Sequence, residues 1–170
     1  MMIAAWLFGI GGILANFLIY QQKSRKNLLT VKLIADCVWT THYALLGAWS
    51  GAGICAVGII RESVFLNENK KWASGKRWLI VFLLLSVASA TITWKNIFSL
   101  FPTLAATLTV FSFWHGDPRL TKILAFPISI CFLTYNISCL SYVGVLNEAV
   151  VLTSALVGLI RDSVSRRRHC

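Results

Sequence analysis

The segment VGIIRESV at residues 57–64 recurs as VGLIRDSV at residues 157–164. The two copies differ only by an Ile against Leu and a Glu against Asp exchange, and each ends an apolar stretch with an arginine, an acid and a serine. Duplication of a larger unit explains this recurrence, although chance or a shared way of ending a helix would also explain eight residues. A duplication predicts two similar halves within one chain.

The composition is that of a membrane protein. The chain has 170 residues, of which 57% are hydrophobic and 13% charged, and its mean hydropathy is +0.72. This is too apolar for burial in one soluble core. The formal net charge is +10, but the basic residues form short clusters between apolar stretches, so we expect no nucleic-acid partner. Residues 1–5 carry no basic residue, and the first apolar stretch is expected to be retained as a helix.

Seven apolar stretches are separated by short polar connections. Each is near the length of about 20 residues that crosses about 30 Å of hydrocarbon. They cover residues 2–20, 28–48, 50–66, 78–94, 97–114, 121–142 and 144–161. The sequence therefore predicts an all-α integral membrane protein with seven transmembrane helices.

The basic residues alternate with these stretches. An external N-terminus puts 15 of the 16 lysines and arginines into cytoplasmic segments and leaves only Lys95 outside. The 15 are Lys23, Arg25, Lys26, Lys32, Arg61, Lys70, Lys71, Lys76, Arg77, Arg119, Lys122, Arg161, Arg166, Arg167 and Arg168. Because basic residues near span ends favour the cytoplasmic side, we expect the N-terminus outside and the C-terminus in the cytoplasm.

The repeat and the spans together predict a 3+1+3 order. Residues 1–69 would form a first three-helix bundle, residues 70–96 a cytoplasmic loop and linker helix, and residues 97–170 a second bundle with a basic tail. Four spans separate equivalent points, so the two bundles have the same orientation. In transporters with such parallel repeats, the substrate binds between the halves near the midplane.

Short motifs follow the same order along the chain. They are QKSRK at 22–26, HYALLG at 42–47, LFP at 100–102, YN at 135–136 and the two arginine-ending stretches. With these motifs the chain resembles the YgjV-type family of bacterial inner-membrane proteins, and with that family the SWEET and PQ-loop proteins. The resemblance implies a location in the bacterial inner membrane and two three-helix bundles around a cavity that opens alternately to each side.

The chain departs from the SWEET pattern in two respects. SWEET-like carriers usually have a hinge proline in the first helix of each bundle and a substrate-touching asparagine in each third helix. Here Pro102 is present in the fifth stretch, whereas the first stretch has no proline, and Gly58 and Gly158 fall near the asparagine positions. Sugar transport is therefore not implied. Pro102 is the expected hinge, and Pro127 is expected to kink the sixth helix.

Asp36 is the first candidate for a binding site. An ionisable group within a span is a functional-site hypothesis by default, but Lys32, four residues earlier on the same helix face, could instead neutralise it. Trp39 and Tyr43 continue the Asp36 face at helical spacing and would form an aromatic wall, although packing against a neighbouring helix explains them equally well.

Three further residues extend the candidate site. His42 lies about 120° around the helix from Asp36, at 100° per residue, and is either a proton-linked group or a histidine bonded between helices. Tyr135 and Asn136 mirror the second-span site, because Asn136 meets Asp36 at the 100-residue offset of the repeat. The substrate site is expected to comprise Asp36, Trp39, His42, Tyr43, Tyr135 and Asn136.

The charged residues of the repeat have two interpretations. Arg61, Glu62, Arg161 and Asp162 are expected to anchor helix ends at the cytoplasmic surface, with an inner gate as the alternative. Asn16 and Glu148 are weaker site candidates. An asparagine in a span more often bonds helices together, and Glu148, near a helix end, is expected to lie in interfacial water.

The remaining signals are negative. The five cysteines show neither CxxC spacing nor a disulfide framework, and the three histidines are too scattered for a metal set. We therefore expect no cofactor, no metal and no enzymatic activity. The favoured function is a uniporter or proton-coupled carrier of a small polar metabolite, and the alternative is a ligand-sensing or partner-binding membrane protein. The expected partners are the lipid bilayer and the solute, with self-association as a further option.

Overall fold

The computed structural model describes residues 2–75 and 77–167, with side chains described among residues 3–75 and 77–164. Lys76 and Arg168, and the side chains of Arg166 and Arg167, contributed to the charge pattern above but lie outside this description.

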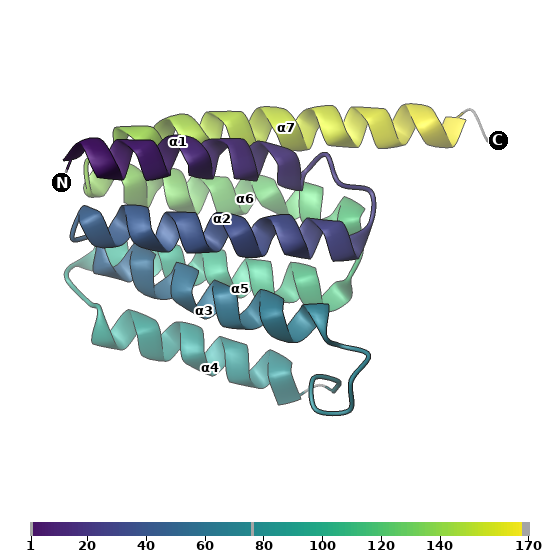
Figure 1. Ribbon diagram of the computed structural model, residues 1–170, viewed down its shortest axis with the longest axis horizontal. Coiled ribbons are helices and arrows are strands. Elements are labelled where there is room, and N and C mark those ends of the chain that lie inside the picture. Colours follow the sequence, from purple (N-terminus) through teal and green to yellow (C-terminus); the bar gives the residue numbers. More distant parts are fainter. Residues whose placement is uncertain (1, 76, 168–170) are drawn as a thin grey trace.

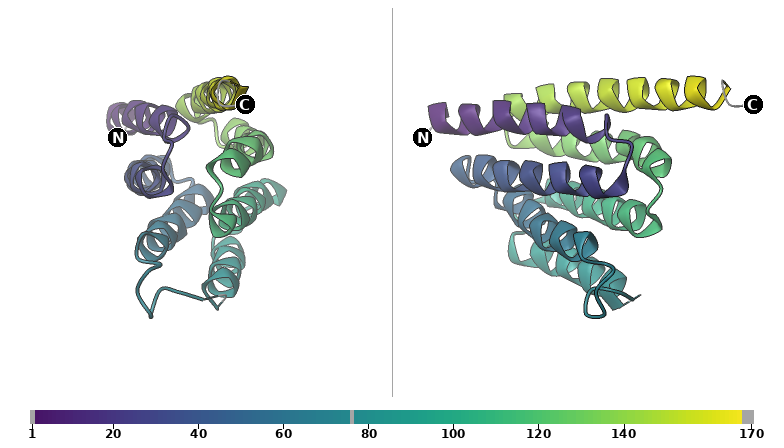
Figure 2. Two further views of the ribbon diagram at one scale, coloured as in Figure 1. Left: turned by 90° about the vertical axis from the view of Figure 1, so that its right-hand side faces the viewer. Right: turned by 45° about the vertical axis from the view of Figure 1, so that its right-hand side comes forward.

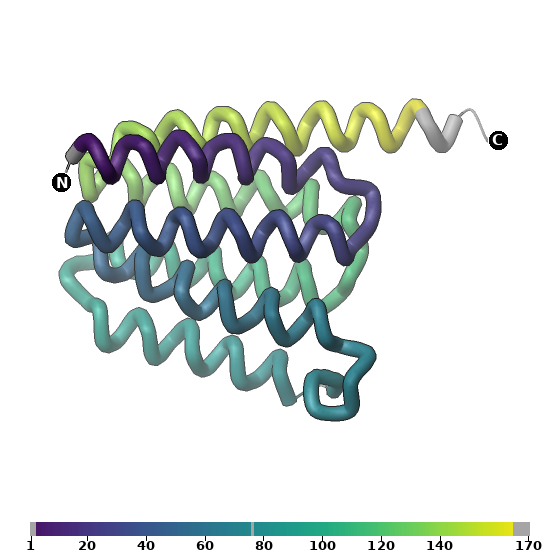
Figure 3. Tube along the Cα trace, in the orientation of Figure 1, coloured from purple at the N-terminus to yellow at the C-terminus, as the bar shows by residue number. Residues whose placement is uncertain are grey.

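Seven α-helices and one short 3-10 helix make up the regular structure of the described residues. They are α1 (Met2–Ile19), α2 (Arg25–Leu45), α3 (Trp49–Leu66), α4 (Arg77–Ile92), η1 (Ile97–Ser99), α5 (Leu100–His115), α6 (Pro118–Ser138) and α7 (Tyr142–Arg167). Consecutive α-helices run in opposite directions, so α1 begins at one end of the bundle and α7 ends at the other (Figure 1, Figure 3). The predicted all-α fold is confirmed, with one α-helix in each expected stretch.

Local signals explain where α2 begins and ends. The hydroxyl of Ser24 accepts a hydrogen bond from the Asn27 backbone N–H at 3.3 Å, which caps the first turn. Gly47 follows the helix at a φ of 65°, a left-handed conformation that favours glycine. The helix therefore covers residues 25–45 rather than the expected 28–48.

The helices differ in whether their length and hydropathy are sufficient to cross a membrane. Four are both long and apolar enough, namely Trp49–Leu66, Ile97–His115, Pro118–Ser138 and Tyr142–Val164, and two shorter apolar helices cover Ile3–Ile19 and Arg77–Ile92. The remaining helix, α2, has 21 residues but carries four charged ones. Composition and length thus support several spans within the described residues.

The helices form two rows that face each other (Figure 2). One row is α1, α2 and α3, and the other is α7, α6 and α5, with α1 packed against α7 and α3 against α5. At the edge, α4 packs against α3 and α5. The fully buried Phe82 fixes α4, because its ring stacks on Trp78 and meets Phe65 of α3 edge-on.

The surface is apolar and the interior holds charges. Large side chains such as Leu7, Leu84 and Ile130 are more than 60% exposed, whereas Glu62 and Lys122 are almost fully buried. This distribution suits lipid as the solvent, since apolar side chains face hydrocarbon at no cost and intramembrane charges face the bundle interior.

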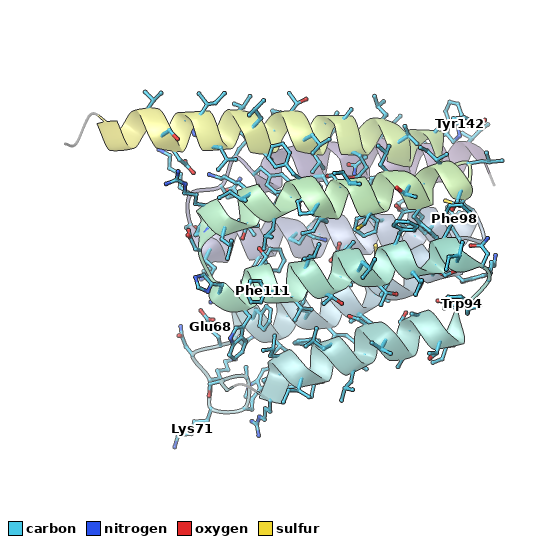
Figure 4. All side chains as sticks on the ribbon, turned by 180° about the vertical axis from the view of Figure 1, so that it is seen from behind. Glu68, Lys71, Trp94, Phe98, Phe111 and Tyr142 are labelled. Carbon is cyan, nitrogen blue, oxygen red and sulfur yellow. The ribbon has the colours of Figure 1, made fainter. Side chains whose placement is uncertain are left out.

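The two ends of the bundle differ in their side chains. Trp94, Phe98 and Tyr142 lie at the end where α1 begins, whereas Glu68 and Lys71 lie at the opposite end (Figure 4). Tryptophan and tyrosine are enriched at membrane interfaces, and lysine and arginine in cytoplasmic loops. The charged end is therefore the one that the sequence predicts to be cytoplasmic.

Candidate functional site

A cavity of about 80 Å³ lies between the two rows and is lined by residues of every α-helix except α4. It has room for several water molecules, and it is smaller than the cavity of about 150 Å³ that holds benzene in an engineered protein. Its polar lining is Asn16, Tyr20, Lys32, Asp36, Trp39, Tyr43, Cys55, Arg61, Thr109, Ser112, Thr121, Ser129, Asn147 and Glu148. The wall therefore combines charges of both signs with aromatic rings.

Asp36 lies in this wall with cations on both sides. One carboxylate oxygen, Oδ1, is paired with Lys32, while the other, Oδ2, lies 3.7 Å from Nη2 of Arg61 and makes no hydrogen bond. Gly58 of α3 permits this approach, because a Cβ at that position would collide with the carboxylate. The structure thus contains the Lys32–Asp36 pair and also places Asp36 at the cavity, so the two interpretations are compatible.

Arg61 and Glu62 form a second buried pair. Nε and Nη2 of Arg61 donate to Oε1 of Glu62 at 3.1 and 2.7 Å, and the two residues are 3% and 0% exposed. The guanidinium also lies over the ring of Phe113, 5.5 Å from its centroid. Both side chains are therefore inside the bundle rather than at the surface position that the sequence predicted.

The second copy of the repeat makes different contacts. Arg161 donates to the side-chain and backbone oxygens of Gln21 at 3.2 and 2.9 Å, and so links α7 to the end of α1. Asp162 accepts a hydrogen bond of 2.6 Å from the buried Lys122 of α6. Its side chain is 26% exposed, so the second copy lies closer to the surface than the first.

A layer of hydrogen bonds joins the two rows at the end where α1 begins. The Tyr43 hydroxyl donates to Oδ1 of Asn136 at 2.8 Å, and the Tyr135 hydroxyl accepts from the Gly51 N–H at 3.0 Å. His42 contacts the Ser141 hydroxyl at 2.9 Å. Of the six expected site residues, Asp36, Trp39 and Tyr43 line the cavity, whereas His42, Tyr135 and Asn136 belong to this layer. A role of any of the six in substrate binding stays a prediction.

Asn136 does not occupy the structural counterpart of Asp36. Asp36 is the twelfth residue of α2, but Asn136 is the nineteenth of α6, and the twelfth of α6 is Ser129. Ser129 lines the cavity, and its hydroxyl makes no hydrogen bond. Equivalent positions of α2 and α6 are therefore fewer than 100 residues apart in the sequence. Ser129, rather than Asn136, lies at the same position along its helix as Asp36.

The two expected hinge prolines lie in different settings. Pro102 is the third residue of α5, where a missing N–H costs no helical hydrogen bond. Pro127 lies inside α6, which continues through it. A hinge function for either proline stays a prediction.

Glu148 is the cavity residue that the sequence did not place correctly. It was expected in interfacial water, but it is 5% exposed and lines the cavity. The Asn147 amide donates to its Oε1 at 2.9 Å, and Asn16 of α1 donates to Asn147 at 2.9 Å. The available signal was the three-to-four-residue spacing on α7 that Glu148 shares with Val151 and Ala155, both buried.

The described residues contain no group of three His, Cys, Asp or Glu side chains that could hold a metal ion.

A family model described as a bacterial inner membrane protein, Imp-YgjV, matches residues 3–166. Neither a curated protein nor a solved structure matches the chain. The family match covers nearly all of the helical bundle and agrees with its apolar surface. The chain belongs to the Imp-YgjV family of bacterial inner membrane proteins.

Proposed function

We propose that the protein transports a small polar solute through the cavity between its two helix rows. One observation carries the proposal: Oδ2 of Asp36, Nε1 of Trp39 and Oγ of Ser129 are buried without a hydrogen-bond partner in the wall of one cavity. An unsatisfied buried polar group costs about 1–3 kcal/mol. A polar solute between α2 and α6 would satisfy these atoms. The proposal involves no enzymatic step and no cofactor.

The proposed architecture is 3+1+3, with seven transmembrane spans and the bundle boundaries predicted from the sequence. The helix contacts support it. In this architecture α1 is equivalent to α5, α2 to α6 and α3 to α7. The α1–α7 contact is then equivalent to the α5–α3 contact, and the α1–α2 contact to the α5–α6 contact. All these contacts are present, as an approximate twofold axis along the helices requires. A relation to SWEET and PQ-loop proteins stays a prediction.

The proposed orientation places the N-terminus outside and the C-terminus in the cytoplasm. A reporter fused after Cys170 should be cytoplasmic, and one fused before Met1 should be external, because the basic connections then lie inside. Protease protection of the two reporters in intact cells measures this. Both reporters on the same side would contradict a chain with seven spans.

Alternating access requires that the hydrogen-bonded layer at the end where α1 begins can open. Tyr43→Phe removes the hydrogen bond to Asn136 and leaves a buried acceptor unpaired, which costs about 1–3 kcal/mol. Cys55 lines the cavity and is buried. All cysteines other than Cys55 are replaced by alanine. In this background we expect Cys55 of the Tyr43→Phe variant to react at least about fivefold faster with a small external methanethiosulfonate reagent. The reason is that about 1 kcal/mol changes the equilibrium between the closed and open layer fivefold.

Tyr142→Phe is the matched control for this prediction. Tyr142 lies at the same end of the bundle, but its side chain is 72% exposed. The control should leave the labelling rate of Cys55 unchanged. Equal rates in the Tyr43→Phe variant and the unmodified protein would show that this hydrogen bond does not hold the layer closed.

Untargeted uptake tests the transport function itself. Metabolites should be compared in cells with and without the protein, with a variant Ser129→Ala as a further sample. Ser129 is buried and unpartnered, so its removal should spare folding and reduce uptake of the transported solute. Solute binding to the purified protein without a difference in uptake would instead support a ligand-sensing protein.

A further inference from the structure

One acidic residue of the cavity wall has no cationic partner. Lys32 is paired with Asp36, and Arg61 with Glu62. Glu148 is also buried, and among the described residues no Lys, Arg or His nitrogen lies within 4.0 Å of its carboxyl group. Two neutral pairs therefore leave the Glu148 carboxyl group without a cationic partner, and such a buried group is neutral unless a cation meets it.

The surroundings of Glu148 supply no such partner. Its one hydrogen bond comes from the neutral amide of Asn147. The neutral Ser129 hydroxyl also lies near it, and Tyr20, Tyr43 and Lys32 are the titratable groups of the cavity wall whose interactions reach it. Lys32 is already bonded to Asp36. A carboxylate inside a membrane protein is strongly unfavourable unless a positive charge meets it.

We propose that the solute carries a positive charge and that the Glu148 carboxylate binds it. This inference rests on the proposed function of the cavity and adds the chemical class of its solute, a small organic ammonium ion. Aromatic side chains of α2 and α6, namely Trp39, Tyr43 and Phe132, also line the cavity, and aromatic faces attract organic cations. A volume of about 80 Å³ restricts the cation to a few heavy atoms.

Methylammonium is the probe for this site. Thermal unfolding of the protein in lipid nanodiscs should be followed as methylammonium chloride replaces sodium chloride at constant ionic strength. We expect the Tm to rise with the logarithm of methylammonium concentration, as for a ligand that binds only the folded state. Sodium acetate, whose anion is similar in size to methylammonium, should not raise the Tm.

Two variants make the measurement specific. Glu148→Gln keeps the oxygen that accepts from Asn147 and removes the charge, so the protein should fold and the apparent methylammonium affinity should fall about 30-fold or more. Glu68→Gln is the matched control, because Glu68 pairs with Arg25 and does not line the cavity. It should keep the full shift in Tm.

Several results would overturn the inference. They are an unchanged shift in Glu148→Gln, an equal shift with acetate, or no shift with methylammonium, ethylammonium and guanidinium in the unmodified protein. The proposed function fails separately. Methylammonium binding without uptake into proteoliposomes would support a cationic ligand and contradict transport. Uptake of an uncharged solute without methylammonium binding would support transport and contradict a cationic solute.

Discussion

Asp36→Asn should lower the free energy of unfolding by about 3–5 kcal/mol, the usual cost of removing one partner of a buried ion pair. Asp36 is 3% exposed and holds Lys32 on one oxygen, with Arg61 3.7 Å from the other. The amide leaves Lys32 without an anion inside the bundle. Equilibrium unfolding in mild detergent with increasing dodecyl sulfate measures the change.

Two companion variants separate charge from shape. Asp117→Asn removes a carboxylate outside the cavity, and asparagine caps the start of α6 as well as aspartate does, so stability should hardly change. Lys32→Met combined with Asp36→Leu removes both charges and should recover most of the lost stability. If that stable double variant also showed normal uptake, Asp36 would have no part in the solute site.

The helical fold could be predicted because apolar stretches and basic connections alternate along the chain. The details that were not predicted depend on contacts distant in sequence or on single turns. The chain enters α5 through η1, where the Asn96 side chain accepts from the Phe98 N–H at 3.1 Å. The sequence pattern did not predict this 3-10 turn. It shows an apolar stretch that begins at residue 97, and Asn96 before it is simply one residue of a polar connection.

The candidate site was predictable only within one helix. Asp36, Trp39 and Tyr43 share a face of α2 at helical spacing, and all three line the cavity. Glu148 was misplaced because a carboxylate seven residues into a helix resembles an interfacial residue. Its burial depends on the packing of α7 against α1, where Asn16 bonds the adjacent Asn147, and against α6. No pattern within α7 contains these contacts.

The repeat itself illustrates the same limit. Arg61 and Arg161 occupy identical positions in the two copies, yet one is bonded to an acid and the other to a glutamine. The local segment specifies a helix with a glycine one turn before an arginine. The surroundings outside the segment differ: Arg61 bonds the adjacent Glu62 and lies 3.7 Å from Asp36 of α2, whereas Arg161 bonds Gln21, just after α1.

This difference makes the two arginines a matched pair of substitutions. Arg61→Met should cost about 3–5 kcal/mol, because it leaves the fully buried Glu62 as an uncompensated carboxylate. Arg161→Met should cost about 1–3 kcal/mol, because it removes hydrogen bonds to Gln21 while Asp162 keeps its bond to Lys122. The same unfolding measurement in mild detergent compares them.

The combination of Arg61→Met with Glu62→Gln identifies the cause of the larger loss. If the loss comes from the unpaired Glu62 charge, neutralising that charge should restore much of the stability that Arg61→Met removes. If it comes from the packing of the guanidinium over Phe113, the double variant should stay as unstable as Arg61→Met. Equal losses for Arg61→Met and Arg161→Met would contradict the different environments of the two copies.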